Sequence, residues 1–248
     1  MQNKGVIYTA SGKKYVKEAI HSAKSIKKYN KDLKVTLFTC DQDVKSKYFD
    51  NVIVQPNNKH PQKYKIENMV NSPYDHTLYI DSDTEITASI AELFDFLLIY
   101  DMGLTNRVYC NFDNPKKIIF IDYIDKECYN GGFLLFNKTK ETTEFLSQWS
   151  KIMNRNKDDE IRPGSPTGDQ IPLNNLIFKE NLLESLGIKY VILPNKIYNA
   201  RPWCWKPMKE AGEFQNIKIL HNKGLNVSLY TKVIRKIKHK IKSTYANR

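Results

Sequence analysis

Two aspartates that flank a single small residue end an apolar segment in "TLYIDSDTEI", residues 77–86. Residues 77–80 favour a buried strand, and in an extended chain the side chains of Asp81 and Asp83 point the same way. Like charges a few ångströms apart repel unless a cation or a proton lies between them. The spacing therefore predicts a divalent metal site at the end of this strand, although surface turns and other metal-dependent folds also contain the pattern.

Three further stretches place polar residues beside apolar segments. Asn130 precedes two glycines and an apolar strand in "YNGGFLLFNK", and glycines there let the backbone approach a ligand closely. Asp169 and Gln170 in "TGDQIPLNNLIF" could hydrogen-bond hydroxyl groups, although Asp169 alone is better explained as a helix N-cap. His221 ends a short apolar strand in "IKILHNKG", where it is either a surface residue or a metal ligand. Together with the aspartate pair, these residues favour one shared site.

Alternating strands and helices must position these residues. Strands are predicted at 6–9, 35–39, 52–54, 78–80, 103–105, 132–136, 190–193 and 217–220, and helices at about 14–29, 62–71, 140–153 and 169–179. This alternation indicates an α/β fold with a mostly parallel sheet and helices on both faces, whose ligand crevice lies at the carboxyl ends of the strands. The polar segment 155–168 predicts a mobile loop, which either closes over a substrate or is a plain surface excursion.

These motifs resemble those of the GT-A fold nucleotide-sugar glycosyltransferases, in particular the family 8 type that includes glycogenin and bacterial galactosyltransferases. The resemblance covers about residues 5–224. It rests on "YIDSDTEI", "YNGGFLLFN", "GDQIPLN" and "HNKG", and on a first strand and helix in "VIYTASGKKYVKEAIHSAKSI". It implies a GT-A (Rossmann-like) domain with a mostly parallel sheet flanked by helices and a smaller acceptor-side lobe.

The resemblance also implies roles for individual residues. Asp81, Asp83 and His221 would bind the metal, and Asp169 and Gln170 would hold the donor sugar and have the catalytic role. The implied donor-binding residues are Tyr8, Thr9, Tyr15, Lys65, Asp81, Ser82, Asn130, Gly131, Gly132, Lys223 and Gly224. Two of these roles stay open. Lys65 could instead be a lysine on a helix surface. The segment "HNKGLNVSLYTK" lacks the Lys-Pro-Trp that usually continues the histidine motif, so the phosphate contact by Lys223 is also open.

The implied reaction is transfer of a sugar from a nucleotide-diphosphate sugar, with a UDP-sugar favoured, to a hydroxyl group of a glycan or glycoconjugate, with retention of configuration. The departing diphosphate gains negative charge, which a hard divalent cation stabilises. Mn²⁺ is favoured over Mg²⁺ because it accepts an imidazole among oxygen ligands. An inverting relative would need a carboxylate base, for which Asp169 is the candidate.

Two other functional classes are alternatives. A phosphatase of the haloacid dehalogenase type also begins with Asp-x-Asp at a strand end, but Glu85 stands where that motif has Thr or Val. Its last acidic pair could only be Asp158 and Asp159. A basic binding protein for membrane or nucleic acid is suggested by the net charge of +12. Because the chain has no signature of a nucleic-acid-binding fold, no nucleic-acid partner is expected.

The densest group of basic residues lies at the C-terminus, where "TKVIRKIKHKIKSTYANR" combines an apolar helical stripe with lysines. Residues 1–228 are expected to form the glycosyltransferase domain. Residues 229–248 are expected to form a basic amphipathic helix that contacts an anionic membrane peripherally or packs on the domain. The four scattered cysteines fit free thiols, and the lack of an apolar span or leader favours a cytoplasmic location.

Overall fold

The computed structural model describes residues 3–106, 110–111, 114–118, 128–161 and 167–226. The predicted basic helix at 229–248, the domain boundary after residue 228 and residues 162–166 of the predicted mobile loop lie outside the described residues. Within the described part of the chain, no helix combines the length and the apolar character needed to cross a lipid bilayer.

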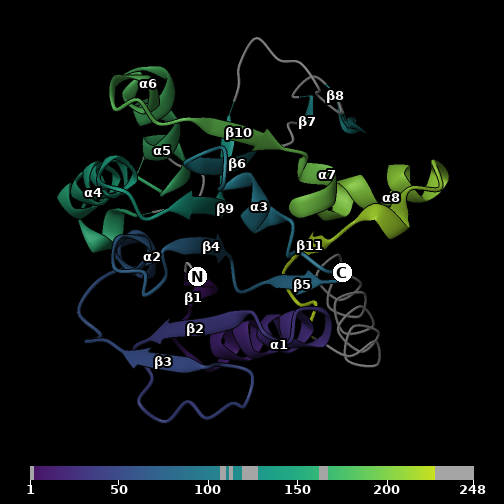
Figure 1. Cartoon of the computed structure of the whole chain (residues 1–248), viewed down its shortest axis with the longest axis horizontal. Helices are drawn as coiled ribbons and strands as arrows, with labels where there is room; N and C mark the ends of the chain where they lie inside the picture. The colour runs from purple at the N-terminus through teal and green to yellow at the C-terminus, as the bar shows by residue number, and fades with distance from the viewer. Residues whose placement is uncertain (1–2, 107–109, 112–113, 119–127, 162–166, 227–248) are drawn as a thin grey trace, which may run out of the picture.

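A seven-stranded sheet forms the centre of the molecule, with the strand order β10-β6-β9-β4-β1-β2-β3 (Figure 1). Its strands are β1 (Lys4–Thr9), β2 (Lys34–Thr39), β3 (Asn51–Val54), β4 (His76–Ile80), β6 (Met102–Asn106), β9 (Tyr129–Asn137) and β10 (Tyr190–Leu193). Neighbouring strands are parallel except at β9, which is antiparallel to both β4 and β6. The predicted α/β fold with a mostly parallel sheet is confirmed.

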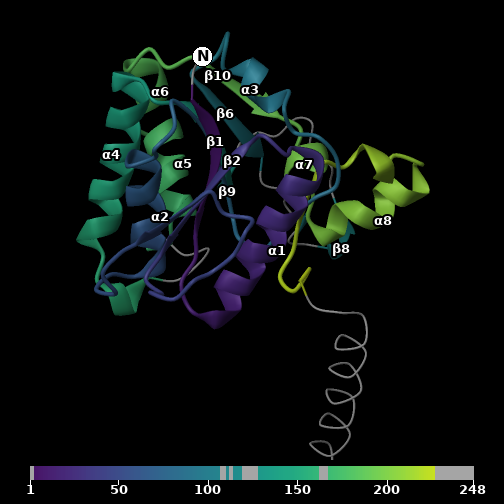
Figure 2. The same ribbon diagram turned by 60° about the horizontal axis from the view of Figure 1, so that its bottom comes forward.

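Helices cover both faces of this sheet, as Figure 2 shows. One face carries α1 (Lys13–Tyr29) and α3 (Leu93–Phe96), and the other carries α2 (Pro61–Val70), α4 (Lys140–Arg155), α5 (Gln170–Phe178) and α6 (Leu182–Ser185). The division follows from the strand period of two, because Val6 and Tyr8 pack with α1 whereas Ile7, between them, packs with α2. The four predicted helices are confirmed with ends within two residues of those expected.

The antiparallel direction of β9 determines where the site lies. If β9 were parallel to β4, the start of β9 would lie at the other edge of the sheet, away from the carboxyl end of β4. Here the register pairs Ile80, the last residue of β4, with Phe133 near the start of β9. The next backbone contact continues this pairing, since Asp81 N donates to Gly132 O at 3.0 Å. The segment that contains Asn130 therefore lies directly beside the aspartate pair.

The other strands of the described residues form two short two-stranded sheets. One pairs β5 (Thr84–Ile86) with β11 (Ile219–His221), and the other pairs β7 (Cys110–Asn111) with β8 (Asn114–Ile118). The strand predicted at 217–220 is found as β11, which begins two residues later than predicted, after the 3₁₀ helix η2 (Phe214–Asn216).

A small lobe, residues 195–221, has a hydrophobic cluster of its own. The lobe contains α7 (Asn195–Tyr198), α8 (Pro202–Glu210), η2 and β11. The buried residues of its own cluster are Ala200, Cys204, Met208 and Ile217. Trp203 and Trp205 pack on this cluster and are partly buried. The lobe agrees with the smaller lobe expected from the sequence, although its short helices were not predicted.

Candidate active site

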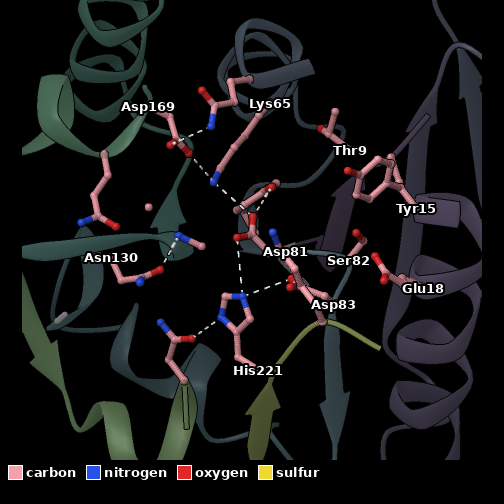
Figure 3. A pocket seen from close by; sticks show the side chains of 18 of the residues that line it. Thr9, Tyr15, Glu18, Lys65, Asp81, Ser82, Asp83, Asn130, Asp169 and His221 are labelled. Carbon is pink, nitrogen blue, oxygen red and sulfur yellow. Dashed lines mark hydrogen bonds and ion pairs between the residues drawn. The ribbon is translucent and has the colours of Figure 1, made fainter. Parts of the chain in front are cut away.

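The aspartate pair and His221 come together at the carboxyl end of β4. Asp81 and Asp83 lie in the turn between β4 and β5, and the antiparallel register of β5 and β11 places His221 opposite Thr84. A further backbone contact, from Asn222 N to Asp83 O at 2.9 Å, fixes the two segments beside each other. One ligand atom from each of the three side chains lies within 4.8 Å of the others (Figure 3).

His221 presents one ring nitrogen to both carboxylates. Its Nε2 lies 3.1 Å from Asp83 Oδ1 and 3.7 Å from Asp81 Oδ2. Its Nδ1 lies 2.6 Å from Asn199 Oδ1, and the amide of Asn199 is oriented by a 2.9 Å bond from Nδ2 to Thr105 Oγ1. A carbonyl oxygen only accepts, so Nδ1 carries the proton. The guanidinium of Arg201, 3.0 Å from Nε2, only donates, so Nε2 carries a lone pair. The side chain is 1% exposed, so the alternative of a surface histidine is wrong.

Gly132 forms the floor beneath this group. A Cβ atom at residue 132 would lie 2.5 Å from Asp81 Oδ2 and 2.8 Å from both Asn130 Oδ1 and His221 Cε1. Asn130 Oδ1 in turn accepts from Gly132 N at 2.7 Å. Only glycine leaves room here, and the two carboxylates with one imidazole nitrogen are a donor set that fits Mn²⁺ or Mg²⁺.

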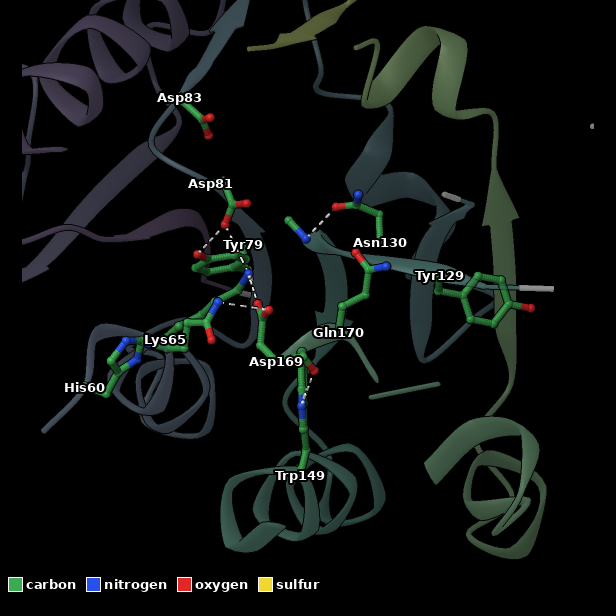
Figure 4. Close-up of polar contacts among 12 residues, drawn as sticks. His60, Lys65, Tyr79, Asp81, Asp83, Tyr129, Asn130, Trp149, Asp169 and Gln170 are labelled. Atoms are coloured by element: carbon green, nitrogen blue, oxygen red, sulfur yellow. Dashed lines mark hydrogen bonds and ion pairs between the residues drawn. The ribbon is translucent and has the colours of Figure 1, made fainter. Parts of the chain in front are cut away.

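Lys65 connects the aspartate pair to Asp169 (Figure 4). Its Nζ lies 2.7 Å from Asp169 Oδ2 and 3.1 Å from Asp81 Oδ1, and Tyr79 donates its hydroxyl to the same oxygen of Asp81 at 2.8 Å. With 7% exposure, Lys65 is not the helix-surface lysine of the alternative prediction. Two buried side chains, Lys65 and Asp169, and the partly buried Asp81 thus share two ion pairs.

These contacts decide the charges of Asp81 and Lys65. Burial would raise the pKa of Asp81, but the positive charge of Lys65 and the hydrogen bond from the Tyr79 hydroxyl act against burial and hold this pKa below its ordinary value. Burial would lower the pKa of Lys65, but the carboxylates of Asp169 and Asp81 raise it above its ordinary value. Both groups are therefore ionised at neutral pH, as a metal ligand and its neighbouring cation would need to be.

Asp169 and Gln170 lie at the start of α5 and line the same cavity as the aspartates. Asp169 stands at the N-cap position of α5, as the N-cap alternative predicts, but its side chain caps no backbone N–H. Its carboxylate instead pairs with Lys65 and accepts from Gln62 Nε2 at 3.3 Å. Its carbonyl oxygen accepts from the Trp149 indole at 3.0 Å, which ties the backbone to α4.

The cavity has a volume of about 570 Å³ and lies between two walls. Figure 3 places Thr9, Tyr15 and Glu18 on one side and Asn130 and Asp169 on the other. Among the predicted site residues, those that line it are Thr9, Tyr15, Lys65, Asp81, Ser82, Asp83, Asn130, Gly131, Gly132, Asp169, Gln170, His221 and Lys223. The structure thus brings together segments from nearly the whole described chain.

Two predicted donor contacts lie elsewhere. The Tyr8 side chain is fully buried in the core under α1, where its hydroxyl lies 2.7 Å from Ser22 Oγ. The Tyr8 side chain therefore does not line the cavity, because alternate residues of β1 face opposite layers. Gly224 does not line the cavity, and its backbone N–H donates to the carboxylate of Glu18.

Several lining residues were not predicted as site residues. Asn199 and Arg201 reach His221 from the small lobe, and Glu18 and Gln62 line the cavity from α1 and α2. The sequence has no signal that links Asn199 to a histidine in a different strand. For Tyr79 the sequence does contain a signal: Tyr79 precedes Asp81 by two residues in an extended segment, so both side chains point to the same side.

Comparisons with known proteins bear on the fold. None of the known protein-family models matches the chain, and no curated protein sequence matches it. In structure, the chain is similar to the crystal structure of the glycosyltransferase GlyE in Streptococcus pneumoniae TIGR4, with a TM-score of 0.58 and 20% sequence identity. The chain has the fold of that glycosyltransferase. The alignment covers 92% of this chain and 57% of that one, so the chain spans little more than half the length of the GlyE structure.

Proposed function

We propose that the protein is a metal-dependent glycosyltransferase that moves a sugar from a nucleotide-diphosphate sugar to a hydroxyl group of a glycan or glycoconjugate. One observation supports this most strongly: Asp81, Asp83 and His221 bring ligand atoms within 4.8 Å of one another in a cavity of about 570 Å³. A UDP-sugar is the favoured donor and Mn²⁺ the favoured metal, with Mg²⁺ as the alternative. We further propose that the reaction retains anomeric configuration.

The protein's own residues would bind the donor and hold it in place. A divalent cation, when bound, would supply positive charge at the departing diphosphate. Thr9, Tyr15 and Ser82 would contact the nucleoside from the β1 side, and Asn130 would line the sugar side with the backbone of Gly131 and Gly132. Lys223 lies in the cavity wall, where its ammonium could contact a phosphate group.

Lys65 and Asp169 would act as one unit at the donor sugar. Asp169 Oδ2 is held by Lys65 and Oδ1 by Gln62, which fixes the carboxylate orientation. Such a fixed carboxylate can accept from sugar hydroxyls, and Gln170 beside it can both donate and accept. Because Asp169 is already ion-paired, this geometry favours a role in holding the sugar over a role as a free general base.

A donor screen tests the proposal without knowledge of the acceptor. UDP- and GDP-sugars are incubated with the protein and Mn²⁺, and the release of nucleotide diphosphate is measured with and without chelator. We expect slow, Mn²⁺-dependent hydrolysis of one donor, and product analysis by NMR then gives the anomer. Absence of hydrolysis, together with no thermal shift by UDP and Mn²⁺, would contradict the proposal; bound ligand at about 100 times its Kd adds roughly 2.7 kcal/mol.

The phosphatase alternative has no support in the geometry. Asp158 and Asp159 lie in the 3₁₀ helix η1 (Asp158–Glu160), and neither lines the cavity. Asp158 instead forms an ion pair with Lys63 at 2.6 Å. A cytoplasmic location and peripheral membrane contact through residues 229–248 remain predictions from the sequence.

A further inference from the structure

Arg201 reaches the candidate metal ligands from the small lobe. Its Nη2 lies 3.0 Å from His221 Nε2, the nitrogen that faces Asp81 and Asp83. The backbone holds it there, because Ala200 N donates to Ile219 O and Ala200 O accepts from His221 N, each at 2.9 Å. The contact between the guanidinium and the imidazole is thus built into the pairing of residue 200 with β11.

The guanidinium of Arg201 forms no ion pair with any residue that the structure describes, and its Nε is buried there without a hydrogen-bond acceptor. The ring of Trp203 lies 5.8 Å from the guanidinium carbon, which restricts the side chain without neutralising it. A guanidinium that uses so few of its donors is costly to keep in a half-buried wall unless an anion joins it at some stage.

His221 Nε2 cannot accept a hydrogen bond from Arg201 and bind a cation at the same time. With the proton on Nδ1, Nε2 has one lone pair, which either accepts from Arg201 or binds a metal. A guanidinium at 3.0 Å from that nitrogen would also be repelled by a divalent charge placed there. Arg201 must therefore release Nε2 before His221 can act as a ligand.

We propose that Arg201 is a metal-gated clamp for the diphosphate of the donor. This rests on the proposed function. With a divalent cation held by Asp81, Asp83 and His221, the guanidinium of Arg201 would leave Nε2, turn into the cavity that it already lines and pair with the phosphate oxygens. The planar guanidinium fits two phosphate oxygens at once, and its charge stabilises the diphosphate as it leaves. Metal binding and nucleotide binding are then coupled through one side chain.

The test measures Mn²⁺ binding by electron paramagnetic resonance, with and without UDP, and UDP binding by calorimetry. Arg201→Met removes the guanidinium but keeps an apolar stem against Trp203. Lys206→Met is the charge control, because Lys206 lies in α8, the helix that Arg201 precedes, and its 86% exposed side chain pairs with Glu210. Arg201→Lys keeps the charge but cannot bind two phosphate oxygens in a planar fork.

Without UDP, we expect Arg201→Met to bind Mn²⁺ several-fold more tightly than the wild type, because the competitor for Nε2 is gone. UDP should tighten Mn²⁺ binding in the wild type by roughly 5- to 150-fold, the usual range for coupled sites, and by several-fold less in Arg201→Met. In Arg201→Lys, UDP should tighten Mn²⁺ binding as little as it does in Arg201→Met. Lys206→Met should match the wild type in Mn²⁺ binding both with and without UDP.

Weaker or unchanged Mn²⁺ binding by Arg201→Met without UDP would overturn the proposal, because it would mean that Arg201 only positions His221. An unchanged UDP effect in both Arg201 variants would overturn it as well. If Arg201→Met does not fold, as judged by circular dichroism, the UDP effect on Mn²⁺ binding in Arg201→Lys tests the proposal instead. A wild type that binds neither Mn²⁺ nor UDP would instead contradict the proposed function itself.

Discussion

His221 and Thr84 are register partners in the antiparallel pair of β11 and β5. Thr84 directly follows the aspartate pair, so this single register places an imidazole 3.1 Å from Asp83 although 138 residues separate the two in the chain, from 83 to 221. A shift of one residue would turn the histidine to the other face of the ribbon. The metal-binding geometry thus depends on two strands of three residues each.

Asp83→Asn should abolish Mn²⁺ binding while leaving the fold intact. Asp83 faces His221 but forms no ion pair with Lys65 among the described residues, so its loss removes a ligand without unpairing a buried lysine. Mn²⁺ binding is measured by electron paramagnetic resonance and stability by urea unfolding. Asp159→Asn, which removes the same charge from an exposed residue outside the cavity, should bind Mn²⁺ like the wild type. Normal binding by Asp83→Asn would show that the metal lies elsewhere.

Gly132→Ala should disrupt the metal site more than Gly131→Ala does. The added methyl group at residue 132 would lie 2.5 Å from Asp81 Oδ2, whereas at residue 131 its nearest atom is Asp169 Oδ2 at 3.3 Å. We expect Gly132→Ala to lose Mn²⁺ binding and Gly131→Ala to retain it. Gly131→Ala should instead weaken binding of the donor sugar. Equal Mn²⁺ affinities would mean that Asp81 can move without cost and is not a fixed ligand.

Asn199→Ala should weaken Mn²⁺ binding by about 10- to 100-fold, the range found when the partner of a metal-binding histidine is lost. Asn199 accepts from His221 Nδ1 at 2.6 Å and so keeps the lone pair on Nε2. Asn154→Ala is the matched control, because Asn154 bonds to Glu67 on the surface. An unchanged affinity in Asn199→Ala would show that the histidine does not need this bond to present Nε2.

Lys65→Met should destabilise the protein by about 3–5 kcal/mol, because it leaves Asp81 and Asp169 as unpaired charges in a buried site. Urea unfolding gives the free energy of unfolding. Lys59→Met is the control: Lys59 pairs with Glu67 through a 40% exposed side chain, and such pairs contribute about 0–1 kcal/mol. A change of under about 1 kcal/mol in both variants would show that water, not Lys65, balances the two carboxylates.

Asp169→Asn should lower donor affinity together with turnover, because we infer that Asp169 holds sugar hydroxyls. UDP-sugar binding is measured by calorimetry and turnover with the donor found in the screen. If turnover is lost while donor affinity stays near that of the wild type, Asp169 acts as a base in the reaction step. NMR analysis of the product anomer gives an independent answer, since a base at this position would accompany inversion.

The sequence by itself determined the main fold and the first half of the site. Apolar residues with a period of two or of 3.6 predicted eight strands and four helices that the structure contains, each with ends within three residues of those observed, because burial against a sheet or helix imposes those periods. Asp81 and Asp83 were recognisable because neighbouring residues in one extended segment point the same way, a relationship within the chain that needs no tertiary contact.

Tertiary structure alone decided the remainder of the site. Nothing local to residue 221 distinguishes a buried ligand from a surface histidine, and nothing near Asn199 or Arg201 shows that both reach its ring. Those contacts follow from the antiparallel direction of β9 and from the pairing of β5 with β11, which depend on how the whole chain packs. Tyr8 illustrates the same limit, because the layer toward which a strand residue points is set by the helices that cover the sheet.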